Sequence, residues 1–505
     1  MTETTSSYRR ILKNSSIIGG SSIARVGIGL VRTKVLALIL GPTGVGVASL
    51  YSGFLNTAGT LATMGLGTVG TRQIAEAFTK QDARAIAVAR RAMFWGTLVL
   101  AGAAMLAVWS LRSVLARLVL GSSSYASAVG WLALGVGLLV VAASQSALLQ
   151  GMYRIGDLAR VTIWAAVLNA ALGIACLWKW GWHGLVGYAL VGAFANFAAG
   201  QFYVSRLPRP EKHTIAWPEL AQQWSALLRL GVAYVGGGLS LTLTQLWIRV
   251  YLGKSLGPGP LGQYQAAWTI STYYISFILT AMATDYYPRL TSVIDDREGA
   301  SRLVNEQSEV ALLLSTPVFV AMMAIAPWAM RLLYSAQFAP AVILLRWQVL
   351  GDVLKVASWP LGFVLLAAGD GKAFFWSESV TNLLTAMLIV LLAPVVGLQI
   401  TGISYLATYA SYLPLVYWLA RRRVAFRWSR SVSRLTVGAF VACVLAWGLA
   451  ILHPWGMLLG VGLAVWLAVF ALGRISHMSA LSGPVGRLGQ IARRWTTGRG
   501  RNSKR

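Results

Sequence analysis

Apolar stretches long enough to cross a membrane follow one another along nearly the whole chain, with short polar segments between them. An α-helix rises about 1.5 Å per residue, so roughly 20 apolar residues are needed to cross the hydrocarbon core of a bilayer. The pattern therefore predicts an all-α polytopic membrane protein with fourteen transmembrane helices. The predicted helices cover residues 15–38, 44–68, 92–111, 128–150, 161–180, 184–205, 226–251, 261–283, 309–333, 341–367, 376–396, 398–419, 435–452 and 455–473.

The chain contains an internal repeat. The sequence "LGPTGVG" at residues 40–46 recurs as "LGPGPLG" at residues 256–262. An even number of predicted helices separates the two copies, so both run in the same direction across the membrane. Parallel repeats of this kind are a design of membrane transporters. The predicted domains are an N-lobe of six helices over residues 1–210, a C-lobe of six helices over residues 211–425, an appended helix pair over residues 426–475 and a basic tail over residues 476–505.

Composition excludes a water-soluble protein, because 57% of the residues are hydrophobic and only 11% are charged, where soluble domains carry about 25% charged residues. The net charge of +28 comes mainly from Lys and Arg in alternate loops, such as residues 69–91 and the "RRR" that begins at Arg421. Such residues are retained on the cytoplasmic side, so both termini are expected in the cytoplasm. No basic stripe is interleaved with base-stacking aromatic residues, so no nucleic-acid partner is expected.

The sequence does not favour an enzyme. A membrane-embedded polymerase or ligase needs a sizeable outward loop to bind donor and acceptor, and the predicted outward loops are short. Cys176 and Cys443 both lie in apolar stretches, which favours neither a disulfide framework nor a metal motif. We therefore expect no catalytic residue, metal or cofactor.

Four cations lie in predicted membrane helices: Arg25, Arg32 and Lys34 in the first helix and Arg249 in the seventh. A charge at mid-bilayer costs about 2.5–3.5 kcal/mol on insertion scales, so such residues usually line a water-filled cavity or pair with one another. Arg25 and Arg32 are seven residues apart and share a helix face, whereas Lys34 lies nearer the outer end and can extend to the interface. We predict that all four bind substrate, with structural pairing as the alternative.

The stretch "RWQVLGDVLKVASWP", which begins at Arg346, places Gln348, Asp352 and Lys355 in the tenth predicted helix. Asp352 and Lys355 are three residues apart and can pair within the helix. They either form a self-neutralising structural pair or line a cavity that binds substrate or an ion. Together with Glu378, at the start of the next helix, Asp352 is a candidate for coupling to a proton or sodium gradient. Cations outnumber these carboxylates, which favours an anionic substrate. Candidates for further pocket contacts are Gln145, Trp268, Tyr273 and Tyr274.

The stretches "SSIARVGIGLVRTKVLALILGPTGVG" and "RWQVLGDVLKV" resemble the Wzx-type lipid-linked oligosaccharide flippases, especially the branch that moves the lipid III of enterobacterial common antigen. The resemblance runs over about residues 10–425, within a superfamily that includes the lipid II flippase and multidrug exporters of the MATE type. It implies two six-helix lobes in the bacterial inner membrane. The implied activity is transfer of an undecaprenyl-pyrophosphate-linked oligosaccharide to the periplasmic leaflet by alternating access, for O-antigen, common antigen or exopolysaccharide assembly.

The resemblance also assigns residues. Arg25, Lys34 and Arg249 match the cavity cations of the family, Asp352 and Glu378 match its carboxylates, and Lys355 lies in the shared motif, whereas Arg32 stands where a small residue is expected. The appended helices match an extra pair that helps to form a lipid groove in the lipid II relative. The implied partners are the lipid-linked glycan, the bilayer and the polysaccharide polymerase machinery. The alternative is an ion-coupled MATE-type multidrug exporter, which would need an acidic cavity for cationic drugs.

Overall fold

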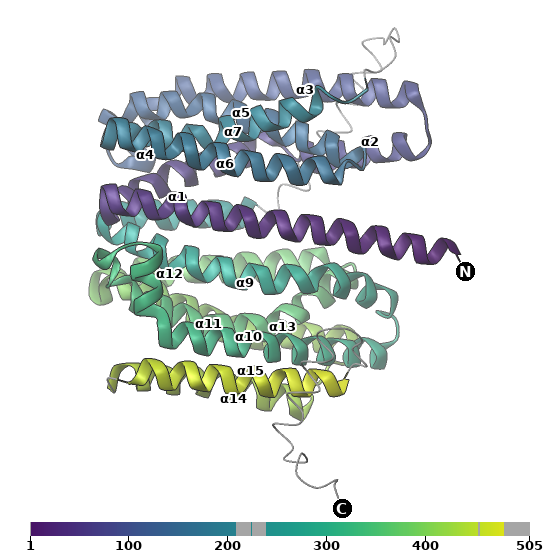
Figure 1. Ribbon diagram of the computed structural model, residues 1–505, viewed down its shortest axis with the longest axis vertical. Coiled ribbons are helices and arrows are strands. Elements are labelled where there is room, and N and C mark those ends of the chain that lie inside the picture. The colour runs from purple at the N-terminus through teal and green to yellow at the C-terminus, as the bar shows by residue number, and fades with distance from the viewer. Residues whose placement is uncertain (1, 209–223, 225–238, 453–454, 479–505) are drawn as a thin grey trace, which may run out of the picture. The chain divides into compact units, whose positions relative to one another are not determined.

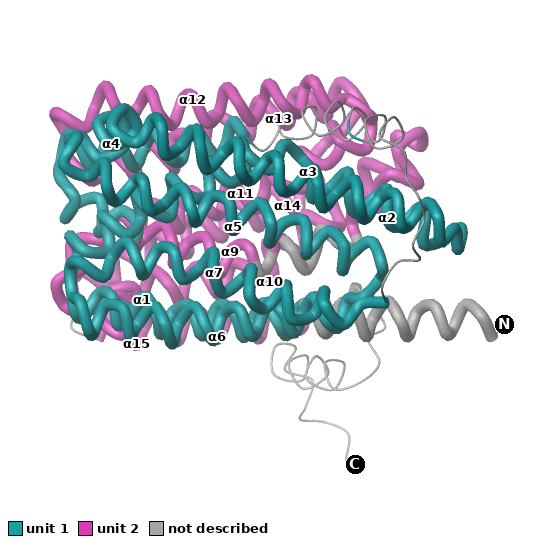
Figure 2. Tube along the Cα trace, turned by 90° about the horizontal axis from the view of Figure 1, so that it is seen from above, with its two compact units in different colours: residues 1–265, 333–335 teal, residues 266–332, 336–505 magenta. Residues whose placement is uncertain are grey.

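The computed structural model describes residues 2–208, 224, 239–452 and 455–478, and every regular element in these residues is a helix (Figure 1). The chain divides by its internal contacts into two compact units (Figure 2). Unit 1 comprises residues 1–265 and 333–335, and unit 2 comprises residues 266–332 and 336–505. The proposed lobe boundary at residue 210 stays a prediction.

Unit 1 is built from long helices that follow one another in sequence. They are α1 (Thr2–Thr63), α2 (Leu66–Thr79), α3 (Ala83–Ser110), α4 (Arg112–Leu120), α5 (Ala126–Gly151), α6 (Ile155–Trp180), α7 (Leu185–Val204) and a helix over residues 239–255. The element α1 contains the first two predicted helices, which meet at a kink where Gly41 has φ 60° and Pro42 follows. Glycine adopts this conformation readily and proline cannot donate a helical hydrogen bond, so the sequence itself places the bend.

The two copies of the repeated turn contact each other reciprocally. A Cβ atom on Gly46 would lie 1.9 Å from the carbonyl oxygen of Pro258, and one on Gly262 would lie 1.8 Å from the carbonyl oxygen of Pro42. Backbone therefore passes directly over both glycines, where no side chain fits. Equivalent positions of the two copies make equivalent contacts, which supports the internal repeat read from the sequence.

Unit 2 holds the remaining helices. They are α9 (Pro258–Ser292), whose first turns belong to unit 1, α10 (Arg297–Leu333), α11 (Ala341–Ala367), α12 (Gly371–Val396), α13 (Ile400–Val424), α14 (Arg430–Leu452) and α15 (Gly456–Met478). The element α11 has the predicted bounds and is buried along most of its length. Its C-terminal part packs into a hydrophobic core with α9 and α13 that includes Tyr286, Leu361 and Val416.

Each of the fourteen predicted stretches has a helical counterpart in the described residues. Residues 226–238 of the seventh stretch and residues 479–505 of the basic tail lie outside them. Within the described part, eight helical stretches are long and apolar enough to cross a membrane by length and composition. The chain is thus an all-α, multi-pass membrane protein. The predicted third helix, residues 92–111, ends next to the end of α3 at Ser110, but α3 begins earlier, at Ala83, and the short helix α4 that follows it was not predicted.

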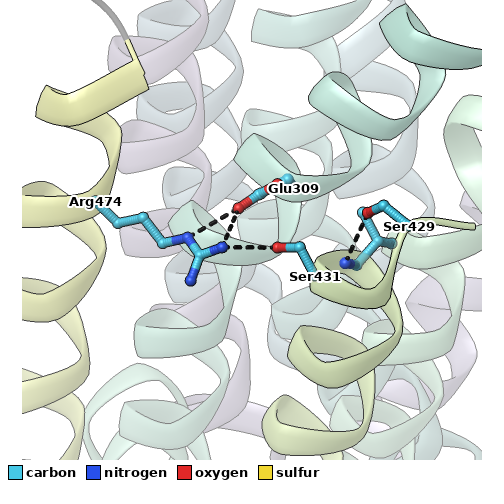
Figure 3. Close-up of polar contacts among 5 residues, drawn as sticks. Glu309, Ser429, Ser431 and Arg474 are labelled. Atoms are coloured by element: carbon cyan, nitrogen blue, oxygen red, sulfur yellow. Dashed lines mark hydrogen bonds and ion pairs between the residues drawn. The ribbon is translucent and has the colours of Figure 1, made fainter.

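The appended helices α14 and α15 are tied to α10 by polar side chains near one end of unit 2 (Figure 3). Arg474 of α15 donates to Glu309 of α10 at 2.8 Å and to the hydroxyl of Ser431 in α14 at 2.7 Å. The side-chain oxygen of Asn305, also in α10, accepts from the backbone N–H of Ser429 at 2.8 Å. These contacts hold the helix pair against α10.

Candidate functional site

The carboxyl group of Asp352 lies at a junction of three helices in unit 2 and is 0% exposed. Its Oδ1 accepts from the hydroxyl of Tyr405 in α13 at 2.7 Å. Its Oδ2 accepts from Ser271 at 2.7 Å and from Tyr274 at 2.5 Å, both in α9. A buried carboxyl group is tolerated only where donors replace its water, and here three hydroxyl groups do so.

Tyr405 links Asp352 to Lys355. The Lys355 amine donates to the Tyr405 hydroxyl at 3.3 Å, while the same hydroxyl donates to Asp352. Among the described residues, no direct ion pair joins Asp352 and Lys355, although their spacing within α11 allows one. The Tyr405 phenol therefore connects the two charged groups by hydrogen bonds, so that a change of charge at one group can alter the hydrogen bond to the other.

A row of tyrosines on α13 connects this centre with Glu378. Tyr405, Tyr409 and Tyr412 follow one face of the helix, and the ring centroids of successive pairs are 4.9 Å and 6.1 Å apart. Tyr412 donates to Glu378 Oε1 at 2.7 Å, and the Lys355 amine lies 5.5 Å from the Tyr409 ring. The structure thus brings the three charged residues predicted from this region into one polar cluster.

Gln348 lies one turn before Asp352 on α11 and is also 0% exposed. Within the described residues, neither its amide nitrogen nor its amide oxygen has a hydrogen-bond partner. A buried polar group without a partner costs about 1–3 kcal/mol. Both polar atoms of this amide are therefore available to a ligand.

Arg249 is a half-buried cation of unit 1. Its Nε donates to the side-chain oxygen of Gln265 at 3.0 Å, and its Nη1 would lie 3.1 Å from a Cβ atom on Gly53. In the described part of the chain, no carboxylate pairs with Arg249. Its half-buried positive charge is bonded to a neutral amide and is not neutralised by any carboxylate of the described residues.

The other cations of α1 have different surroundings. The Arg32 guanidinium lies 3.6 Å from the centroid of the Tyr188 ring and donates to the Tyr188 carbonyl oxygen. Lys34 donates to the carbonyl oxygen of Tyr334, and Arg25 is exposed. The contacts of Arg32 are those of a residue that packs α1 against α7, which favours the structural alternative for this residue. No contact tests the predicted roles of Arg25, Arg32 and Lys34 in substrate binding, which stay predictions.

Several residues of the cluster were not predicted from the sequence. Ser271, Tyr405, Tyr409 and Tyr412 were not predicted, although the tyrosine spacing in "YLATYASY" at residues 405–412 is a readable helix-face signal. Of the four additional pocket candidates, Tyr274 bonds Asp352 and Trp268 packs edge-on against Tyr405 at 5.7 Å between ring centroids. Gln145 instead donates to Gln201 at 2.9 Å in unit 1.

Comparison with known proteins places the chain among transporters. The profile of a family described as "Polysaccharide biosynthesis protein" matches residues 35–343, more than half of the chain. The lipid III flippase of Escherichia coli (strain K12) is 24% identical over 421 residues, which cover 82% of this chain and 99% of that protein. The succinoglycan biosynthesis transport protein ExoT of Rhizobium meliloti (strain 1021) is 26% identical over 217 residues, 42% of this chain and 40% of that protein.

Two solved structures share the fold. The lipid II flippase MurJ in an inward closed conformation aligns with a TM-score of 0.69 and 11% identity, over 90% of this chain and 98% of that one. An inward-facing MATE family multidrug resistance transporter of the MOP superfamily aligns with a TM-score of 0.64 and 16% identity, over 79% and 94%. The relatives are named as flippases and transport proteins, in agreement with the prediction that this chain is not an enzyme.

Proposed function

The chain belongs to the polysaccharide biosynthesis protein family, and from this premise we propose that it is a flippase for a lipid-linked oligosaccharide. The substrate is an undecaprenyl-pyrophosphate-linked repeat unit, moved from the cytoplasmic to the periplasmic leaflet of the bacterial inner membrane. The product then serves assembly of a surface polysaccharide. The observation that carries the proposal is Arg249, a half-buried cation that no carboxylate of the described residues neutralises.

Arg249 supplies the chemistry for the anionic part of this substrate. A guanidinium offers paired N–H donors that match the geometry of phosphate oxygens. Gln265 accepts from Nε of Arg249, and no hydrogen bond of the terminal nitrogens is found among the described residues, so these nitrogens are available to a ligand. Arg25 and Lys34 add positive charge along α1. The lobes alternate access between the two leaflets, while the hydrocarbon tail remains in an apolar environment.

The cluster of unit 2 supplies ion coupling. A proton or sodium ion that reaches Asp352 competes with the hydroxyl donors of Ser271, Tyr274 and Tyr405, which come from α9 and α13. Its arrival therefore changes the hydrogen bonds between three helices. Intramembrane carboxyl groups commonly act as proton relays, and the unpartnered amide of Gln348 offers a further ligand for a cation. Glu378 is the second carboxyl group of this path.

Orientation and partners follow from the same proposal. Both termini lie in the cytoplasm, on the side where the lipid-linked substrate is made, and the Lys and Arg residues of alternate loops support this orientation. The translocated unit is consumed by polysaccharide polymerase machinery, which is a proposed partner at the periplasmic face.

A second candidate function is an ion-coupled multidrug exporter. The observation that favours it is the likeness to a MATE transporter together with the buried carboxyl group of Asp352. A cationic drug would need an acidic binding surface, however, and Arg249 presents the opposite charge. Drug resistance of a strain that overproduces the protein distinguishes the two, since the flippase proposal expects no change.

The proposed function is tested in a strain that lacks the gene. Mass spectrometry should show accumulation of a single undecaprenyl-pyrophosphate-linked repeat unit, and the wild-type gene should restore polymer. Arg249→Ala should fail to restore polymer at normal protein level, because neutral alanine cannot bind the pyrophosphate. Arg117→Ala, which removes an exposed cation of α4, is the matched control and should restore it. Full polymer with Arg249→Ala contradicts the proposed role of Arg249, and normal lipid intermediates in the deletion strain contradict the function itself.

A further inference from the structure

An apolar groove of about 560 Å³ lies within unit 1. Its walls come from the second half of α1, from α3, α4 and α5, and from the helix over residues 239–255. Ligand pockets in proteins typically measure about 300–1,000 Å³, so the groove is large enough to hold a molecule. Several lining side chains, among them Leu61, Leu111 and Leu243, keep about half of their surface exposed, and the groove is therefore open to an occupant.

The groove follows two consecutive helices. Its lining includes Leu100 in α3 and Val119 in α4, and only Leu111 separates these helices along the chain. A groove lined by two consecutive helices suits an extended hydrocarbon chain better than a compact ligand.

The chemistry of the lining is that of hydrocarbon. Small side chains form much of the wall, including Ala58, Ala103 and Ala107, so that no bulky group fills the space. The polar exception among the lining residues is Thr57, whose hydroxyl donates to the carbonyl oxygen of Thr242 at 3.5 Å. Nothing in this lining would bind a sugar or a charged group.

One wall of the groove adjoins Arg249. Phe54 and Leu246 line it, and a Cβ atom on Gly53 would lie 3.4 Å from Leu246 Cδ1 and 3.1 Å from Arg249 Nη1. Arg249 thus lies one helical turn after the lining residue Leu246 and contacts Gly53, the residue before the lining residue Phe54. An apolar groove beside a cation that no carboxylate of the described residues neutralises is complementary to an amphiphile with an anionic head and a long chain.

We propose that this groove holds the polyprenyl chain of the lipid-linked substrate while its pyrophosphate contacts Arg249. The substrate class rests on the proposed function, and the inference adds where the chain binds. The expected lipid groove of the appended helices is a different place, since α14 and α15 belong to unit 2. A phospholipid of the bilayer has shorter chains and a different headgroup, and the experiment separates it from the polyprenyl lipid.

The test uses the purified full-length protein in lipid nanodiscs with a photoactivatable undecaprenyl pyrophosphate, followed by peptide mapping. Crosslinks should fall on α3, α4 and the second half of α1. Ala103→Phe, which places a ring in the groove, should lower them about tenfold, since each buried methylene contributes several-fold in affinity. Ala171→Phe is the matched control, an equally exposed alanine of α6 outside the groove, and should leave them unchanged. A milder Ala103→Leu variant guards against misfolding and should show an intermediate loss.

Binding of a short-chain geranyl pyrophosphate separates head from tail. It should depend on Arg249 and stay unchanged in Ala103→Phe, because its chain is too short to use the groove. Three results would overturn the groove inference. The crosslinks map elsewhere, they persist in Ala103→Phe, or a phosphatidylglycerol probe gives the same crosslinks with equal yield. If one of these results is found while the wild-type gene still restores polymer assembly in the deletion strain, the proposed function stands without the groove. If the wild-type gene does not restore polymer assembly, the proposed function itself is refuted.

Discussion

The hydroxyl of Tyr405 is the most informative single group to remove from the cluster in unit 2. It donates to Asp352 at 2.7 Å and accepts from Lys355 at 3.3 Å. Tyr405→Phe keeps the ring and its packing against Trp268, so the change isolates the hydroxyl. A hydrogen bond to a charged group contributes about 1.5–3 kcal/mol, and we expect the free energy of unfolding to fall by this amount.

The same variant should also change transport. Without the phenol, a proton or sodium ion at Asp352 no longer alters the partner of Lys355, so the response to an ion gradient should weaken. We expect gradient-driven translocation to fall about tenfold, which corresponds to about 1.4 kcal/mol in the barrier. The assay is uptake of a fluorescent lipid-linked sugar into the inner leaflet of proteoliposomes, with an imposed proton or sodium gradient and without one.

Tyr417→Phe is the matched control for Tyr405→Phe. Tyr417 lies on the same helix and packs against Phe426 and Trp428, and no hydrogen bond of its hydroxyl is found among the described residues. This control should keep both stability and gradient dependence. If Tyr405→Phe behaves like it in both assays, the hydroxyl does not link the two charged groups and the coupling mechanism is wrong.

Three further predictions follow from the packing. Gly262→Ala should lower the free energy of unfolding by about 1–3 kcal/mol, as expected for an overpacked site, because its Cβ would overlap a backbone carbonyl oxygen. Gly67→Ala is the control and should leave the stability unchanged, since nothing lies within 4 Å of the added atom. In a double-mutant cycle, Arg474→Ala and Glu309→Ala should show a coupling energy of about 0.5–1 kcal/mol, since the pair is partly exposed. Arg32→Lys should reduce stability by about 0.5–2 kcal/mol, the range of a cation–π contact, with unchanged affinity for geranyl pyrophosphate; a loss of affinity would assign Arg32 to the site.

The helices were predictable because one physical length, the thickness of the bilayer, sets the size of every apolar stretch. The tenth helix has the predicted bounds for this reason. The element α4 was missed because two arginines so close together, Arg112 and Arg117, are typical of a loop. In the structure, the Arg112 guanidinium lies 4.7 Å from the centroid of the Trp109 ring and Arg117 is exposed.

The site was predictable only in part. The charges at Asp352 and Lys355 stand out in an apolar stretch, since ionisable residues are rare there. Their partners could not be read from one sequence, because Ser271 is 81 residues and Tyr405 53 residues from Asp352 along the chain. The spacing of Asp352 and Lys355 suggested a direct ion pair, but packing of α13 inserts a phenol between them.

The central claim is that the chain moves an anionic lipid-linked oligosaccharide with Arg249 as a binding cation. The most direct measurement is translocation of an undecaprenyl-pyrophosphate-linked repeat unit in proteoliposomes, read by the accessibility of its sugars to an externally added glycosidase. Wild-type protein should move the lipid between leaflets, Arg249→Ala should reduce the rate to that of empty liposomes, and Arg117→Ala should match the wild type. Equal translocation by wild type and Arg249→Ala, or none by folded wild-type protein, would contradict the claim.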